Sequence, residues 1–167
     1  MGFELNDTHQ PKKLASMLPR FEYVMQTRVI TGKGMVMGEY MGTGTRMMVP
    51  VLGGDFEGPL LKGKVIPGGT EWPLVRHDGK GTIDARYTFQ TDDGVYINIR
   101  NTGHRYGPPE VMSKLNVEWV DPDKYYFRTY AVFEAPSGKY AWLSDFVFLG
   151  IAERVPECLY VRYYKML

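Results

Sequence analysis

Hydrophobic and polar residues alternate along most of this chain in short segments, which glycine- and proline-containing turns separate. Alternation with a period of two is the pattern of a β-strand that buries one face. Only the range 109–115 indicates a helix, a short one that begins at a proline. We therefore expect strands at 21–30, 45–52, 60–66, 72–76, 82–91, 95–102, 125–134, 140–150 (a break near Ser144 being an alternative) and 159–165, with turns at 53–58 and 67–69.

The segment from Thr82 to Thr102 predicts a β-hairpin whose register follows from its patterning. A two-residue loop would mix polar and apolar side chains on both faces, whereas a three-residue turn, Asp92-Asp93-Gly94 with a left-handed Gly94, separates them. The apolar face then holds Ile83, Ala85, Tyr87, Phe89, Val95, Ile97 and Ile99, and the polar face holds Asp84, Arg86, Thr88 and Gln90 opposite Tyr96, Asn98, Arg100 and Thr102.

The number of strands indicates the fold class. About eight to ten short strands with almost no helix are typical of an antiparallel sandwich or a closed barrel. We favour a single antiparallel β-barrel, because several strands are apolar on one face and mixed on the other, and closure leaves no exposed sheet edge. At 167 residues the chain fits one barrel domain, residues 20–167, preceded by a polar N-terminal arm, residues 1–19.

Composition and charge limit the classes of partner. A formal net charge of +1 provides no basic field for nucleic acid, and the N-terminal residues contain no apolar run long enough for a membrane segment. Cys158 is the only cysteine, so an internal disulfide is excluded. We therefore expect a cytoplasmic protein that binds neither nucleic acid nor membranes.

Several motifs resemble the family catalogued as domain of unknown function 3237. They are VIPGGTEW at 65–72, DGKGTIDARYTFQTDDG at 78–94, IRNTGHRYG at 99–107, YYFRT at 125–129 and YAWL at 140–143. The resemblance extends from Phe21 to Lys165 and implies a single antiparallel β-barrel of calycin-like (lipocalin-like) shape. It also implies self-association, so we expect a homodimer or a higher homo-oligomer. It implies no assigned activity.

The pattern of histidines and serines does not favour a metal site or an activated nucleophile. His9, His77 and His104 lack the spacing of metal ligands, and no serine lies in the sequence context of a nucleophile elbow. We therefore expect neither a metal nor any other cofactor.

Carboxylate, guanidinium and imidazole groups in and after the hairpin are the candidate catalytic residues. The predicted register places Arg100 opposite Arg86 and on the same face as Asp84. If this face looks into the barrel, Asp84 or His104 would move a proton while the arginines stabilise negative charge. The alternative is a solvated outer face or an oligomer interface, because an apolar lumen would instead accept Tyr87 and its neighbours.

Further polar and aromatic residues are candidate ligand contacts. Arg128 and Tyr130 share one face of their strand, where a guanidinium and a phenol suit an aromatic or carboxylate ligand. Packing in the apolar core is the alternative for the aromatic candidates. The full set of candidate ligand contacts is Trp72, Tyr87, Arg100, Asn101, Arg128, Tyr130 and Trp142.

These residues predict a cofactor-independent enzyme that uses general acid–base chemistry, of isomerase, cyclase or lyase type. Its substrate would be a hydrophobic, aromatic or polyketide-like molecule in the barrel pocket. A non-catalytic small-molecule binding or carrier protein is the second hypothesis. An interaction module whose polar face joins subunits is the third.

Overall fold

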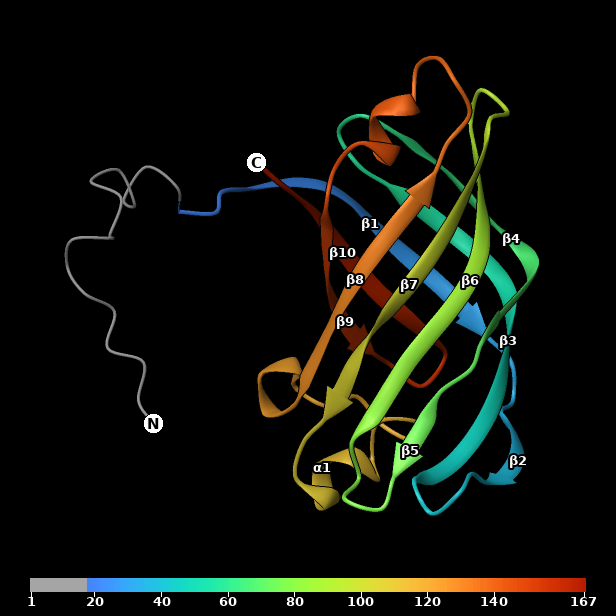
Figure 1. Ribbon diagram of the computed structural model, residues 1–167, viewed down its shortest axis with the longest axis vertical. Coiled ribbons are helices and arrows are strands. Elements are labelled where there is room, and N and C mark those ends of the chain that lie inside the picture. Colours follow the sequence, from blue (N-terminus) through green and yellow to red (C-terminus); the bar gives the residue numbers. More distant parts are fainter. Residues whose placement is uncertain (1–17) are drawn as a thin grey trace.

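The computed structural model describes residues 18–167, in which strands dominate (Figure 1). The predicted N-terminal arm, 1–19, and His9 lie almost wholly outside the described residues. One short helix, α1 (Pro109–Met112), and two 3₁₀ turns, Pro122–Lys124 and Ala141–Ser144, complete the described elements. The strands are β1 (Phe21–Thr31), β2 (Met35–Glu39), β3 (Gly44–Glu57), β4 (Lys62–Glu71), β5 (Leu74–Arg76), β6 (Gly81–Thr91), β7 (Tyr96–Tyr106), β8 (Tyr126–Glu134), β9 (Phe148–Arg154) and β10 (Cys158–Met166).

Eight of the strands close into an antiparallel barrel, in the order β1-β10-β9-β8-β7-β6-β4-β3. The barrel closes because the second half of β3 pairs with β1. The short strands β2 and β5 extend one end of the barrel by pairing with β3, and β5 also pairs with β6. The predicted closed barrel is therefore confirmed. No helix among residues 18–167 has the length and apolar character needed to cross a membrane.

The register of the β6–β7 hairpin is the one that the patterning predicts. Arg86 pairs with Arg100, and the backbone N–H of Thr91 donates to the carbonyl of Val95 over 2.9 Å. Gly94 has a φ of +87°, a left-handed backbone conformation that is costly for any residue with a side chain. The Asp93 carboxylate accepts hydrogen bonds from the side chains of Thr91, Lys139 and Tyr140, and these donors lower the pKa of Asp93 well below its usual range.

Two expected turns are instead parts of strands. β3 continues through Gly53-Gly54, where a Cβ on Gly54 would overlap the carbonyl oxygen of Arg28 on β1. Glycine here permits the close approach of β3 to β1 that closes the barrel. Likewise β4 runs through 67–69, and its register against β6 shifts between Ile66 and Thr70, as in a β-bulge.

The expected continuous strand at 140–150 is wrong over its first half, whereas the alternative of a break near Ser144 agrees with the structure. Residues 141–144 form a 3₁₀ turn, and β9 begins only at Phe148. Two side chains hold this turn against the barrel end: the Tyr140 hydroxyl donates to Asp93, and the Ser144 Oγ accepts from the backbone N–H of Ala135 over 3.1 Å. These tertiary contacts override the apolar patterning. The predicted helix is confirmed but ends at Met112.

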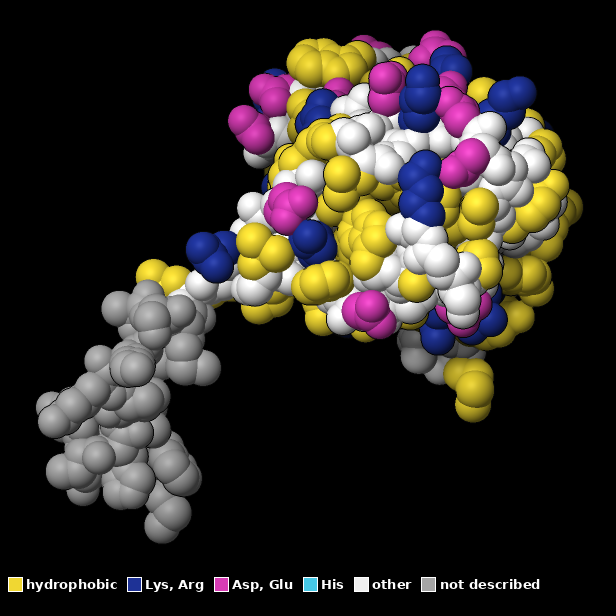
Figure 2. All heavy atoms as spheres, turned by 90° about the horizontal axis from the view of Figure 1, so that it is seen from above, with side chains coloured by type: hydrophobic (Ala, Val, Ile, Leu, Met, Phe, Trp, Pro, Cys, Tyr) yellow, Lys and Arg dark blue, Asp and Glu magenta, His cyan; other side chains and the backbone are white. Residues whose placement is uncertain are grey.

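The barrel interior is packed with aromatic side chains along much of its length. Phe133 lies near the centre, with its ring centroid 4.8 Å from that of Phe148 and 5.6 Å from that of Tyr163, both edge to face. Phe89 and Phe56 continue the cluster at a centroid separation of 4.7 Å. The end of the barrel seen in Figure 2 carries acidic and basic side chains next to one another.

Candidate functional site

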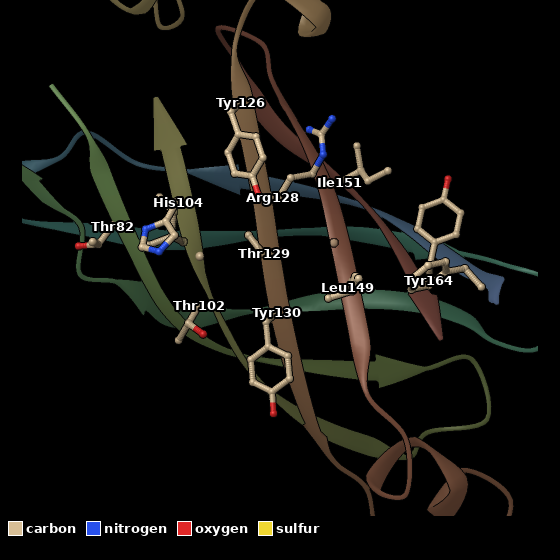
Figure 3. Close-up of a pocket in the computed structure, with 14 residues that line it drawn as sticks. Thr82, Thr102, His104, Tyr126, Arg128, Thr129, Tyr130, Leu149, Ile151 and Tyr164 are labelled. Atoms are coloured by element: carbon tan, nitrogen blue, oxygen red, sulfur yellow. The ribbon is translucent and has the colours of Figure 1, made fainter. Parts of the chain in front are cut away.

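A groove of about 920 Å³ lies on the outer surface of the barrel, over the sheet from β6 to β10 and the start of β1 (Figure 3). Outward-facing side chains from neighbouring strands form its walls, and most of them are apolar or aromatic. They are Phe21, Thr82, Thr102, His104, Tyr126, Arg128, Tyr130, Leu149, Ile151 and Tyr164.

The strand register explains why these residues gather. Side chains alternate between the two faces of a strand, so every second position on β7, β8 and β9 points outward. Cross-strand pairing then aligns the outward residues into two neighbouring rows. The first row is Thr82, His104, Arg128 and Ile151, and the second is Thr102, Tyr130, Leu149 and Tyr164.

The floor of the groove is backbone. Between the two rows runs a third row, Gly103, Thr129 and Gly150, which faces the barrel interior. Thr129 is buried, and a Cβ on Gly150 would overlap its hydroxyl oxygen. A Cβ on Gly103 would overlap the carbonyl oxygen of Arg128. The two glycines therefore allow three strands to approach closely at the centre of the floor.

Arg128 carries the positive charge of the groove. Its Nη1 donates to the carbonyl oxygen of Phe127 over 3.0 Å, and its guanidinium lies 5.4 Å from the ring centroid of Tyr126. Within residues 18–167, no carboxylate lies within salt-bridge distance of Arg128. A guanidinium held in place but without a counter-charge is suited to an anionic ligand.

His104 is the titratable neighbour of Arg128. The two residues are direct register partners on β7 and β8, and Thr82 pairs with His104 from β6. Figure 3 shows the imidazole on the side of β7 nearer Thr82, whereas the guanidinium of Arg128 extends toward Ile151. An imidazole can accept and donate a proton, so this wall of the groove carries a proton-transfer group as well as a cation.

Aromatic rings flank the apolar centre of the groove. Tyr126 stacks on Tyr106 at one end with a centroid separation of 4.9 Å, and Tyr164 contacts Tyr23 edge to face at the other. Tyr130 remains 46% exposed although its ring is large and partly apolar. Exposed aromatic surface in a concave site is typical of ligand binding.

The predicted Asp84, Arg86 and Arg100 patch lies outside this groove and faces solvent. Ala85 and Tyr87, which alternate with these residues on β6, point inward and are buried. The hypothesis that the patch lines the lumen is therefore wrong. Arg100 donates to both carboxylate oxygens of Asp84, over 3.2 and 3.3 Å, so these two charges neutralise each other.

The other candidate residues are dispersed. Tyr87 is in the core, where its hydroxyl lies 3.1 Å from that of Tyr163, and burial raises the pKa of Tyr87 to about 12. Asn101 is only 2% exposed and faces the interior. Trp72 is partly exposed after β4, and Trp142 packs its ring 6.2 Å from Phe148. None of these four lines the groove.

Sequence reasoning thus found three residues of the groove, His104, Arg128 and Tyr130, and missed the apolar ones. Ile151 was missed because its strand was expected to end at Gly150. Leu149 lay inside the expected strand but was missed because the candidates were chosen among polar and aromatic residues. The available signal was that 146–152 is apolar at nearly every position. A strand that is apolar on both faces of a barrel must expose one apolar face.

The fold and the groove define a closed antiparallel β-barrel protein with a concave site on its outer surface. The family described as "Protein of unknown function (DUF3237)" matches residues 19–166. The chain therefore belongs to this family.

Related proteins support the same assignment. A UPF0311 protein from Clostridium acetobutylicum is 37% identical over 147 residues, which cover 87% of this chain and 93% of the relative. The crystal structure of a conserved protein of unknown function from Rhodopseudomonas palustris superposes with a TM-score of 0.85 at 34% identity, covering 89% of this chain and 98% of that one. An enzyme from Penicillium herquei has a TM-score of 0.68 at 22% identity, covering 89% and 95%, and shows likeness of fold alone.

Proposed function

We propose that this protein is an enzyme that acts by proton transfer on a hydrophobic, aromatic small molecule bound in the outer groove. The observation that carries the proposal is the pairing of His104 with Arg128 in one wall of the groove. Enolisation needs a proton acceptor and a group that stabilises the enolate, and a guanidinium with no carboxylate partner within residues 18–167 suits the second role. Isomerisation, cyclisation and elimination all begin with such a step.

The size and lining of the groove support a small-molecule ligand. Its volume of about 920 Å³ lies within the roughly 300–1,000 Å³ common for ligand sites. Leu149 and Ile151 provide apolar contact near the centre, and Tyr130 offers a ring for stacking. A ligand that matches this lining has an aromatic body and one acidic or enolisable group.

The proposed chemistry assigns one role to each polar side chain. His104 would accept a proton from a carbon next to a carbonyl group, and the electrons of the broken C–H bond would move onto the carbonyl oxygen. Arg128 would stabilise the resulting enolate through its guanidinium. Return of the proton to another carbon gives an isomer, whereas loss of a leaving group gives an elimination product.

A non-catalytic carrier is the second candidate function. It is favoured by one observation: no described side chain forms a hydrogen bond with His104 in the structure, so nothing fixes the orientation of its imidazole. A catalytic histidine is commonly oriented by a second group.

The fungal protein of the same fold is described as an enzyme, which makes catalysis compatible with this barrel.

Phenylpyruvate is a suitable probe, because it is aromatic, anionic and enolisable. We expect the protein to accelerate the exchange of its methylene protons in deuterium oxide, measured by proton NMR. His104→Gln should lower that rate by about 100-fold or more while affinity is kept. His77→Gln is the matched control, since His77 is exposed and contacts Glu39 away from the groove. Saturable binding without faster exchange would favour the carrier, and no binding would contradict both.

A further inference from the structure

The short strand β2 has one edge that pairs with no other strand. Within residues 18–167 it pairs only with β3, along Thr45–Met48. In Figure 1 β2 lies at the margin of the fold, beside β3. The free edge of a strand presents a row of unpaired backbone N–H and C=O groups, and these groups can pair with a further strand.

The side chains of β2 are apolar and exposed. Met35, Val36 and Met37 are 51%, 68% and 50% exposed. β2 contains no proline and no lysine, the residues that commonly prevent an edge strand from pairing. Met37 also has no register partner on β3, because the register shifts between Val36 and Gly38. The strand therefore exposes both apolar side chains and backbone groups that a partner strand would cover.

The sequence around β2 is nearly symmetric about Val36. Residues 33–39 read KGMVMGE, so the same residue types precede and follow Val36 up to the two charged ends. If two copies of this segment pair antiparallel about Val36, that residue lies opposite its own copy, and Met35 of each copy lies opposite Met37 of the other. The apolar centre of the segment is thus complementary to itself.

The charged ends of the segment complete the match. In the same antiparallel register Lys33 of each copy lies opposite Glu39 of the other. Within residues 18–167 Lys33 forms no ion pair. Glu39 uses its Oε1 to accept from the backbone N–H of Gly44 over 3.1 Å and to contact His77 Nε2 at 3.1 Å. Its second oxygen, Oε2, is the atom that would face the lysine of the other copy.

We infer that β2 is a dimer interface, at which two copies of this protein pair through their β2 strands about a two-fold axis at Val36. The two hairpins then form one continuous sheet in the order β3-β2-β2-β3. The contact is short, and interfaces of small area are typical of reversible complexes. No residue of β2 lines the groove, so the inference does not depend on the proposed enzyme activity.

Analytical ultracentrifugation of the full chain tests the interface. The wild-type protein should show a monomer–dimer equilibrium that shifts toward monomer on dilution. Val36→Lys would place two like charges opposite each other at the axis, and should raise the dissociation constant of the dimer by about 10-fold or more. Leu60→Lys is the matched control, because Leu60 is also exposed but follows the far end of β3. This control should leave the dissociation constant unchanged.

Reversal of one charge tests the predicted register. Lys33→Glu would place like charges opposite each other at both ends of the paired segment, and should raise the dissociation constant by about 3-fold or more. Lys64→Glu changes the net charge of the protein equally but lies on β4, and should have no effect. Equal effects of the two variants would mean that only net charge matters, and would contradict the register.

A disulfide tests the register without relying on affinity. Val36→Cys would bring two thiols opposite one another, with Cα atoms about 4.5–5.5 Å apart as in antiparallel pairs, a separation that permits a disulfide. Oxidised glutathione should convert this variant to a covalent dimer. Met41→Cys, at a residue that is 98% exposed but lies outside the symmetric segment, should stay monomeric, and the native Cys158 is buried.

Three results would overturn the inference. The first is a wild-type protein that remains monomeric at every soluble concentration, as would be the case if another segment of the same chain covered β2. The second is a dimer that Val36→Lys and Leu60→Lys leave equally stable, because such a dimer would use another surface. The third is equal cross-linking of Val36→Cys and Met41→Cys, which would indicate random collisions.

Discussion

Two neighbouring regions on the outer face of β6, β7 and β8 carry polar side chains but differ in how their charges are paired. In the patch around Asp84, the carboxylate and Arg100 form a bidentate ion pair, with both side chains about half exposed to solvent. In the groove, Arg128 has no carboxylate partner among the described residues and lies against the ring of Tyr126.

The difference indicates which region suits a ligand. A charge that a neighbouring side chain already neutralises, in contact with water, gains little by binding an anion. A guanidinium oriented by a carbonyl group and an aromatic ring, in a concave apolar setting, gains more. A stretch of sequence that is rich in polar residues is thus a weaker guide to a binding site than a charged side chain that forms no ion pair in the structure.

Removing the groove cation should have the largest effect. Arg128→Ala should weaken phenylpyruvate binding roughly 10- to 100-fold, because hydrogen bonds to charged groups contribute about 1.5–3 kcal/mol. Arg86→Ala, which removes an exposed arginine of the neighbouring patch, is the matched control and should leave affinity unchanged. Isothermal titration calorimetry measures both. Equal losses in the two variants would mean that only general charge attraction is involved.

Glu71, at the end of β4, extends the comparison to a carboxyl group that forms no ion pair within residues 18–167. Its folded-state pKa is raised above 4.5, so between pH 4.5 and that higher value the folded protein retains a proton that the unfolded chain has lost. The stability that the protonated Glu71 gives to the folded state is complete below pH 4.5 and is lost as pH rises through the folded-state pKa. The charges of Arg105 and Arg154 oppose the rise in this pKa but do not cancel it.

Glu71→Gln should remove that pH dependence. The free energy of unfolding of the variant relative to wild type should therefore rise from pH 4.5 toward neutral pH, as urea denaturation at several pH values can measure. A relative stability that falls with pH would indicate that the Glu71 carboxylate is stabilised, and the assignment of an unpaired group would be wrong.

The aromatic ring of Tyr130 should contribute less to phenylpyruvate affinity than the guanidinium of Arg128. Tyr130→Ala should weaken phenylpyruvate binding by about 2- to 10-fold, since an aromatic pair contributes about 0.5–1.5 kcal/mol beyond area burial. Tyr130→Phe should retain most of the affinity if the ring rather than the hydroxyl makes the contact. Fluorescence titration of the two variants separates these contributions, and an equal loss in both would assign the contact to the hydroxyl.

Breaking the paired patch should have the smallest effect. Asp84→Asn should change the free energy of unfolding by about 1 kcal/mol or less, because exposed ion pairs contribute little. Thermal melts at low and high salt provide the measurement, and the difference from wild type should shrink in high salt. Loss of phenylpyruvate binding in this variant would show that the patch, not the groove, is the ligand site.

The sequence predicted the barrel and the β6–β7 register because both follow from local rules. Alternating residues define the two faces of each strand, and the three-residue turn ending at Gly94 sets which residues face one another. The 3₁₀ turn at 141–144 was missed because it depends on tertiary contacts, above all that of Tyr140 with Asp93, which lies 47 residues away along the chain.

The groove was only partly predictable for a different reason. Patterning identifies two faces but does not say which one is concave or which polar groups are already paired. His104, Arg128 and Tyr130 were found one by one, whereas their alignment on one outer face required the pairing of β7 with β8.

The most direct test of the central claim is to map where an aromatic anion binds, using methyl-labelled protein. Titration with phenylpyruvate should shift the methyl resonances of Leu149 and Ile151 saturably, because these side chains lie in the centre of the groove. Leu52 and Leu60, exposed elsewhere on the barrel, should not respond. Shifts at Leu52 and Leu60 with none at Leu149 and Ile151 would contradict the assignment of the groove as the ligand site.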